Sequence, residues 1–156
     1  MSEKTAKVKS AQDKWGSKTM DIGFCIIPSI LLRAQQRLGL NPTQLVVLIQ
    51  LLDYWWDKQN KPFPSKRELG SRLGLGPRQI QRYLADLEDA GFIQREERYV
   101  PGKGRSSNKY DLSGLVSKLT ELSPEFKQAS EMKKLVEKGL EPEISLKDLE
   151  EEEKFK

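Results

Sequence analysis

The chain has 156 residues, of which 32% are charged and 37% hydrophobic, and its formal net charge is +4. That length suits one domain with a modest core and tails. There is no histidine and only one cysteine, Cys25, which argues against zinc, a disulfide framework and most general-base catalysis. The start lacks a signal-peptide core, and no apolar run approaches membrane-spanning length. We therefore expect a soluble, cytoplasmic protein that has no metal or cofactor and is not an enzyme.

The N-terminal segment, residues 1–20, is polar and carries five lysines against Glu3 and Asp13. It predicts a flexible basic arm, in which Trp15 is an aromatic side chain that suggests docking onto the body. Apolar neighbours surround Cys25, which we expect to be a buried filler.

Two helices are predicted next, at residues 28–38 and 41–58. Asn41, Pro42 and Gln44 have the pattern of a capped helix start. The second helix is apolar nearly all round, which indicates burial in the core or against a partner chain. We expect residues 54–56, Tyr-Trp-Trp, to lie in the core. If one chain cannot cover both sides of this helix, a homodimer follows.

The central stretch, residues 65–91, has the pattern of two short helices joined by a turn. Ser65 and Glu68 form a capping box that starts the first helix. Glycines in residues 74–76 stop it, because glycine tolerates the left-handed backbone of a helix end. Pro77 suits the first turn of the second helix. This order predicts a helix-turn-helix, whose second helix lies in the DNA major groove.

The second helix carries its charges at the ends that the helix dipole disfavours. Basic and amide side chains gather near its start: Arg78, Gln79, Gln81 and Arg82. Acids gather near its end: Asp86, Glu88 and Asp89. Each misplaced charge costs a few tenths of a kcal/mol, up to about 1, so helix stability does not explain the arrangement. Contact of the basic end with a polyanion does, although an ordinary solvated face is the simpler alternative.

These residue types also suggest individual roles on DNA. We expect the two arginines to contact guanine edges or phosphates, and the two glutamines to favour adenine. Lys66 and Arg67, at the start of the preceding helix, should hold backbone phosphates. The acids at the far end are expected to be solvated rather than catalytic.

After the helix-turn-helix, two strands are predicted at residues 92–98 and 108–112, with Tyr110 and Leu112 on the same side. Strand, loop and strand in this place predict the wing of a winged helix; a flexible hairpin tip is the alternative. The loop and second strand supply donors suited to phosphate or minor-groove contact: Lys103, Arg105, Ser106, Ser107, Asn108 and Lys109.

The C-terminal part predicts two helices, residues 115–122 and another that starts at Ser123-Pro124. We expect residues 114–139 to pack on the core or to pair between chains. Residues 140–156 are acidic and are expected to be a mobile tail.

The residues from Phe24 to Leu122 resemble the winged helix-turn-helix domains of plasmids, phages and integrative elements. The most specific piece is PSKRELGSRLG followed by RQIQRYLADLEDAGFI. That family includes small regulators, replication initiators and primosome proteins of the DnaD type. The resemblance implies a recognition helix that carries the arginines and glutamines named above, and a wing that carries Lys103 and Arg105.

The expected fold is mainly α with a small antiparallel β-wing: a winged helix-turn-helix over residues 21–113 with extra N- and C-terminal helices. The expected function is sequence-specific binding of double-stranded DNA by a homodimer, as a nucleoid-associated transcriptional regulator of a mobile element. Two alternatives stay open. One is a replication or partition accessory that binds origin DNA. The other is a winged-helix adaptor that binds a protein partner, for which the C-terminal helices are a candidate surface.

Overall fold

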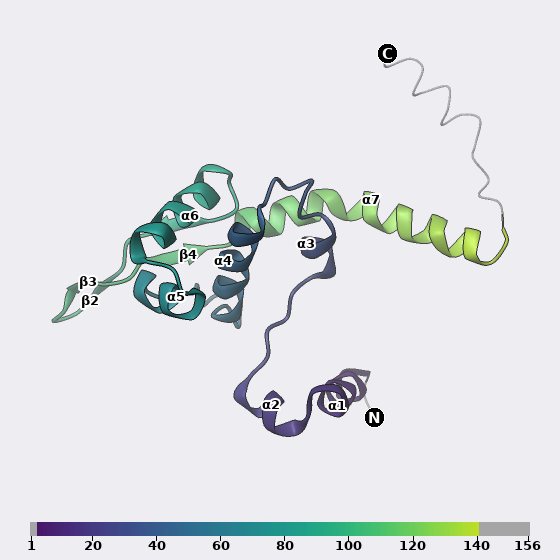
Figure 1. Cartoon of the computed structure of the whole chain (residues 1–156), viewed down its shortest axis with the longest axis horizontal. Coiled ribbons are helices and arrows are strands. Elements are labelled where there is room, and N and C mark those ends of the chain that lie inside the picture. The colour runs from purple at the N-terminus through teal and green to yellow at the C-terminus, as the bar shows by residue number, and fades with distance from the viewer. Residues whose placement is uncertain (1–2, 141–156) are drawn as a thin grey trace, which may run out of the picture. The chain divides into compact units, whose positions relative to one another are not determined.

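The structure is a computed structural model that describes residues 3–140 (Figure 1). In this range the helices are α1 (Glu3–Trp15), α2 (Ser17–Ile22), α3 (Ser29–Arg33), α4 (Pro42–Asp53), α5 (Lys66–Leu73), α6 (Pro77–Asp89) and α7 (Ser113–Glu137). The strands are β1 (Gln94–Glu96), β2 (Tyr99–Val100), β3 (Gly104–Arg105) and β4 (Lys109–Asp111). The chain divides into one unit that ends at Val116 and a second that begins at Ser117. Most of the tail expected at residues 140–156 lies outside the described residues.

The N-terminal segment is helical, where the sequence predicted an arm without regular structure. Helix α1 is rich in Ala, Lys, Glu and Gln, which are strong helix formers. Gly16, with φ 84°, separates α1 from α2. Trp15 is exposed, and the ammonium of Lys14 lies 5.1 Å from its ring centroid. The helices here follow from local propensity.

Helix α3 is shorter than the helix predicted over residues 28–38. It ends at Arg33, and residues 34–39 continue as hydrogen-bonded turns that finish at Gly39, whose φ is 73°. Leu31 and Ala34 still face the core. The apolar spacing therefore predicted the buried side correctly but not the length of regular helix.

Helix α4 begins at the predicted cap. The side chain of Asn41 accepts the N–H of Gln44 at 2.8 Å, and Gln44 accepts the N–H of Asn41 at 3.0 Å. The buried residues of α4 are Leu45, Val47, Leu48, Leu51 and Leu52. One chain thus buries much of this helix by itself, so its apolar character alone no longer requires a homodimer.

The prediction that residues 54–56 lie in the core is wrong for Trp56, which is 67% exposed. Helix α4 ends at Asp53, so Trp56 does not continue the apolar face of the helix. Its ring packs edge-on against Phe24, with the centroids 6.1 Å apart. Cys25, next to Phe24, is half-buried, and this burial raises the pKa of its thiol.

Helices α5 and α6 form the predicted helix-turn-helix. The Ser65–Glu68 capping box is present, with donor–acceptor distances of 2.6 and 3.1 Å. Gly74 ends α5 with φ 66°. Gly70 is needed for a different reason: a Cβ atom at that position would lie 2.3 Å from the carbonyl oxygen of Leu75. The turn therefore folds back onto α5 at van der Waals distance from its backbone.

The sheet expected as a single hairpin consists of two separate ladders. Strands β1 and β4 pair antiparallel, with Arg95 opposite Tyr110, and β2 pairs with β3 further out along the hairpin. Figure 1 shows β2 and β3 projecting beyond the helices. Tyr110 and Leu112 are both buried, as the alternation predicted. The N–H of Tyr110 donates to the carbonyl of Pro62, so the connector before α5 is fixed to β4.

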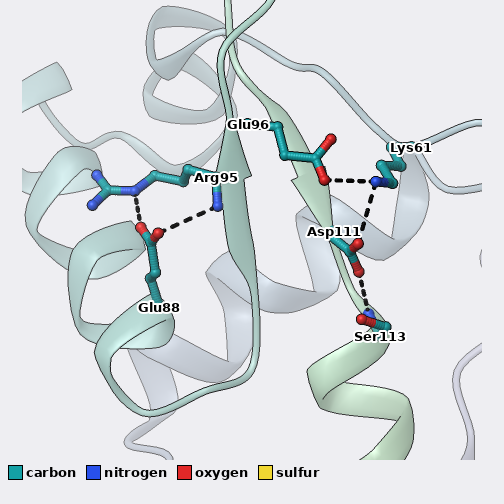
Figure 2. Close-up of polar contacts among 6 residues, drawn as sticks. All are labelled: Lys61, Glu88, Arg95, Glu96, Asp111 and Ser113. Atoms are coloured by element: carbon teal, nitrogen blue, oxygen red, sulfur yellow. Dashed lines mark hydrogen bonds and ion pairs between the residues drawn. The ribbon is translucent and has the colours of Figure 1, made fainter.

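Charged side chains hold the β1–β4 ladder to its neighbours (Figure 2). Lys61 pairs with Glu96 at 2.6 Å and with Asp111 at 3.2 Å. Asp111 also accepts the N–H of Ser113 at the start of α7. The Ser113 hydrogen bonds and Lys61 lower the pKa of Asp111, and Glu96 and Asp111 raise the pKa of Lys61. The connector, both strands and α7 therefore meet at one ion-paired cluster.

Helix α7 is continuous from Ser113 to Glu137 and includes Pro124. The prediction of two helices with a break at Ser123-Pro124 is wrong. Proline in a helix interior costs about 3 kcal/mol, which favoured a helix start at this point. The structure keeps Pro124 inside one long helix.

Candidate nucleic-acid interface

The candidate interface centres on the N-terminal half of α6. The buried positions of this helix are Ile80, Leu84 and Leu87. Because residues three and four apart share a helix face, this packing leaves the predicted contact residues outward, and all four are exposed: Arg78, Gln79, Gln81 and Arg82. Because one face of α6 packs on the core, the opposite face is exposed and can contact another molecule.

The two arginines of α6 are available for an anion. Within residues 3–140, neither Arg78 nor Arg82 forms an ion pair with an acid. The guanidinium of Arg82 lies 5.8 Å from the ring centroid of its neighbour Tyr83, which leaves its donors available.

Gln79 has a structural role that the sequence analysis did not assign. Its side-chain oxygen accepts the N–H of Gly76 at 3.0 Å and so caps the start of α6. Gly76 has no side chain to return the bond, so this is half of a capping box. The amide NH₂ of Gln79 keeps two donors for an outside partner.

Lys66 of α5 and Gln81 of α6 lie together. The ammonium of Lys66 donates to the side-chain oxygen of Gln81 at 3.0 Å. Lys66, which is expected to contact phosphates, is thus hydrogen-bonded to Gln81, which is expected to contact a base edge. Arg67, next to Lys66 in the first turn of α5, is exposed.

The outer part of the wing presents basic side chains. Lys103 lies in the turn between β2 and β3 and is exposed. Arg105, on β3, pairs with Glu97 at 3.2 Å, and the two side chains are 60% and 58% exposed. The hydroxyl of Tyr99 donates to the other oxygen of Glu97 at 3.2 Å. Arg105, a predicted DNA contact, is thus paired with Glu97, an acid near the wing.

The base of the wing is organised by Arg98, a residue that the sequence analysis did not single out. Its guanidinium donates to the hydroxyls of Ser106 at 2.9 Å and Ser107 at 3.0 Å, and to the carbonyl of Ser107 at 3.0 Å. It also lies 4.3 Å from the ring centroid of Phe63. The hydroxyl of Ser107 in turn donates to the carbonyl of Phe63 at 2.7 Å. The two serines, expected as DNA contacts, are therefore engaged within the protein.

The remaining wing residues differ in exposure. Lys109 is exposed on β4, whereas Asn108 is half-buried. Only the strand register brings Arg98 to residues eight and nine positions later, so no local sequence signal marked it.

The acids at the end of α6 do not form a solvated group of three. Asp86 and Asp89 are exposed, but Glu88 is half-buried and pairs with Arg95 of β1 (Figure 2). Glu88 therefore ties α6 to the β1–β4 ladder, and its negative charge lies beside the positive charge of Arg95.

A groove of about 690 Å³ adjoins the wing base, with Trp56, Phe63 and Arg98 among its lining residues. Arg98, Ser106 and Ser107, which all line the groove, are hydrogen-bonded to one another as described above. Among residues 3–140, no group of three or more His, Cys, Asp or Glu side chains is placed to hold a metal ion. In the same range, no helix has the length and apolar character needed to cross a membrane.

These elements define the winged helix-turn-helix class: a capped first helix, a tight turn, an exposed second helix and a β-hairpin wing. Residues 38–93 match the family model described as a helix-turn-helix domain. The chain is also similar to the crystal structure of the N-terminal domain of DnaD protein from Geobacillus kaustophilus HTA426. The sequence identity is 23% and the TM-score 0.48, over 86% of this chain and 100% of that one. Among curated proteins, none matches the chain.

Proposed function

We propose that this chain binds double-stranded DNA in a sequence-specific manner and regulates transcription from a mobile genetic element. The observation that carries the proposal is the exposed, acid-unpaired pair Arg78 and Arg82 near the start of the second helix of a helix-turn-helix domain. In this motif the N-terminal residues of the second helix contact base edges in the major groove.

The roles of the interface residues follow from their chemistry. Arg78 and Arg82 present forked donors that match the two acceptors of guanine, or a phosphate. Gln81 can pair with adenine through its amide once it leaves Lys66. Gln79 contributes through its NH₂ group, because its oxygen holds the helix cap.

The surrounding cations would fix the protein on the phosphate backbone. Lys66, Arg67, Lys103 and Lys109 fit this role in the proposal, because each is a cation without an ion pair to an acid within residues 3–140. Phosphate contacts set register and orientation without reading sequence. Ser106 and Ser107 are hydrogen-bonded to Arg98, and Asn108 is half-buried. The DNA contacts expected of these three residues are therefore secondary in the proposal.

The test begins by selecting bound duplexes from random sequence and measuring affinity for the winner. Arg78→Ala and Arg82→Ala are each expected to weaken that affinity by about 1–3 kcal/mol, roughly 5- to 150-fold, if the arginine reads a guanine. A variant that loses only a phosphate contact should instead weaken all duplexes alike and reduce the salt slope by about 0.9.

The matched control is Arg33→Ala, which removes the same charge from an exposed position of α3. It should change affinity little. Unchanged duplex binding by the doubly substituted Arg78→Ala, Arg82→Ala protein would show that α6 is not the recognition helix. Binding of a protein partner with little salt dependence, and no duplex binding, would favour the adaptor function instead.

The regulatory role needs its own measurement. Mapping the sites that the protein occupies on its host DNA separates the two nucleic-acid functions. Occupancy at promoters supports regulation, and occupancy confined to a replication origin supports the accessory function.

A further inference from the structure

Three side chains on the β2–β3 hairpin and its approach form a small cluster around one carboxylate. Glu97 forms an ion pair with Arg105 at 3.2 Å through one oxygen and accepts a hydrogen bond from the Tyr99 hydroxyl at 3.2 Å through the other. Tyr99 and Arg105 are also register partners across the two strands. Each carboxylate oxygen of Glu97 therefore contacts one of these two side chains, Arg105 or Tyr99.

The pair between Glu97 and Arg105 is exposed, so water screens it and its partners can exchange. Both side chains are more than half exposed, and exposed ion pairs contribute little to stability. A DNA phosphate can bind a guanidinium through two oxygens, whereas Arg105 contacts one oxygen of Glu97. Glu97 and a phosphate thus compete for one guanidinium, and Glu97 also repels the phosphate.

We propose that Glu97 lowers the affinity of the wing for DNA of any sequence, because its carboxylate competes with DNA phosphate for Arg105. This inference rests on the proposed function and concerns the strength of its sequence-independent part. The pairing of β2 with β3 is made by backbone hydrogen bonds. The stability of the hairpin therefore does not explain why Glu97 lies on the wing, whereas competition with phosphate does.

The experiment uses the full chain with Glu97→Gln, because glutamine keeps the shape and can still accept from Tyr99. The protein is titrated with a random-sequence duplex at several salt concentrations. One additional phosphate contact steepens the slope of log affinity against log salt by about 0.9, which corresponds to roughly eightfold tighter binding at 0.1 M salt. Glu131→Gln on α7, an exposed acid, is the control for net charge.

A second variant separates competition for Arg105 from a general charge effect. In an Arg105→Ala background, Glu97→Gln should tighten binding much less, because the guanidinium that it releases is absent and only the direct repulsion of phosphate by Glu97 is removed. Equal tightening with and without Arg105, or equal tightening by Glu131→Gln, would overturn the proposal.

The outcomes also separate this inference from the function on which it rests. If wild-type protein binds duplex and Glu97→Gln binds with the same affinity and salt slope, only the inference is wrong. If no variant binds duplex DNA at any salt concentration, the proposed function and the inference are both wrong.

Discussion

At the residue scale, Tyr110 shows how a buried phenol makes stability depend on pH. Its side chain is 1% exposed, and burial raises its pKa from 10.0 to about 12. In the unfolded chain the phenol ionises first, so between these two values the unfolded state binds fewer protons than the folded state. Its contribution to stability is therefore complete below pH 10 and is lost as the pH rises through 12.

We predict that Tyr110 ionises late in the folded protein, near its raised pKa of about 12. The shift corresponds to at most about 3 kcal/mol of stability lost above pH 12. Ultraviolet absorbance of tyrosinate during an alkaline titration measures it directly. Tyr110→Phe should remove this late step; a late step that survives the substitution, or the absence of a late step in the wild type, would contradict the prediction.

Residue-level predictions from sequence succeeded where the partner was close along the chain. Ser65 and Glu68 are three positions apart, and their mutual cap is present. Ser107 was assigned to DNA because its partners, Arg98 and Phe63, are distant in sequence and are brought near only by the hairpin and connector. The DNA contacts themselves stay predictions.

At the element scale, the close approach between α5 and its following turn depends on a missing side chain. Replacing glycine by alanine inside a helix normally stabilises it by about 0.5–1 kcal/mol. At Gly70 the added Cβ would lie 2.3 Å from the oxygen of Leu75, and a backbone atom must shift to accommodate it.

We predict that Gly70→Ala destabilises the protein by about 1–3 kcal/mol, the usual cost of overpacking. Urea unfolding measures this as a lower midpoint with an unchanged slope. Ser71→Ala, at the next and exposed position of α5, should stay within about 0.5 kcal/mol of the wild type. A stabilised Gly70→Ala protein would show that the turn does not pack this closely.

Element boundaries were predictable where caps and glycines act locally, as at both ends of α5. They were not predictable where a local rule was overridden. Pro124 predicted a helix start yet lies inside α7, and residues 54–56 looked like a helical apolar face although α4 ends at Asp53. The separate β2–β3 ladder has only two residues per strand, too few for an alternating pattern to show.

At the scale of the whole molecule, self-association is the main untested property. Much of helix α4 is buried within the chain, whereas the C-terminal part of α7 leaves apolar side chains exposed. Exposed apolar side chains recur there at helical spacing: Met132, Leu135 and Val136. Apolar stripes of this kind favour pairing with another helix.

We predict a homodimer in solution, with twice the chain mass of 17.9 kDa by sedimentation equilibrium. Val136→Glu, at a position 63% exposed, should shift the equilibrium towards monomer by placing a charge on the stripe. Ser130→Glu, also exposed on α7, changes the net charge by the same amount and is the control for added negative charge. A wild-type monomer at micromolar concentration would refute the prediction.

The hydrogen bond between Lys66 and Gln81 has a thermodynamic consequence for selectivity. If the glutamine amide turns to pair with an adenine, it must give up the ammonium, which then becomes available to a phosphate. In that case the pairing of Gln81 with the matching base and the contact of Lys66 with a phosphate form together. A wrong base at this one position would cost both, so discrimination there would exceed what a single side chain provides and would grow as the salt concentration falls.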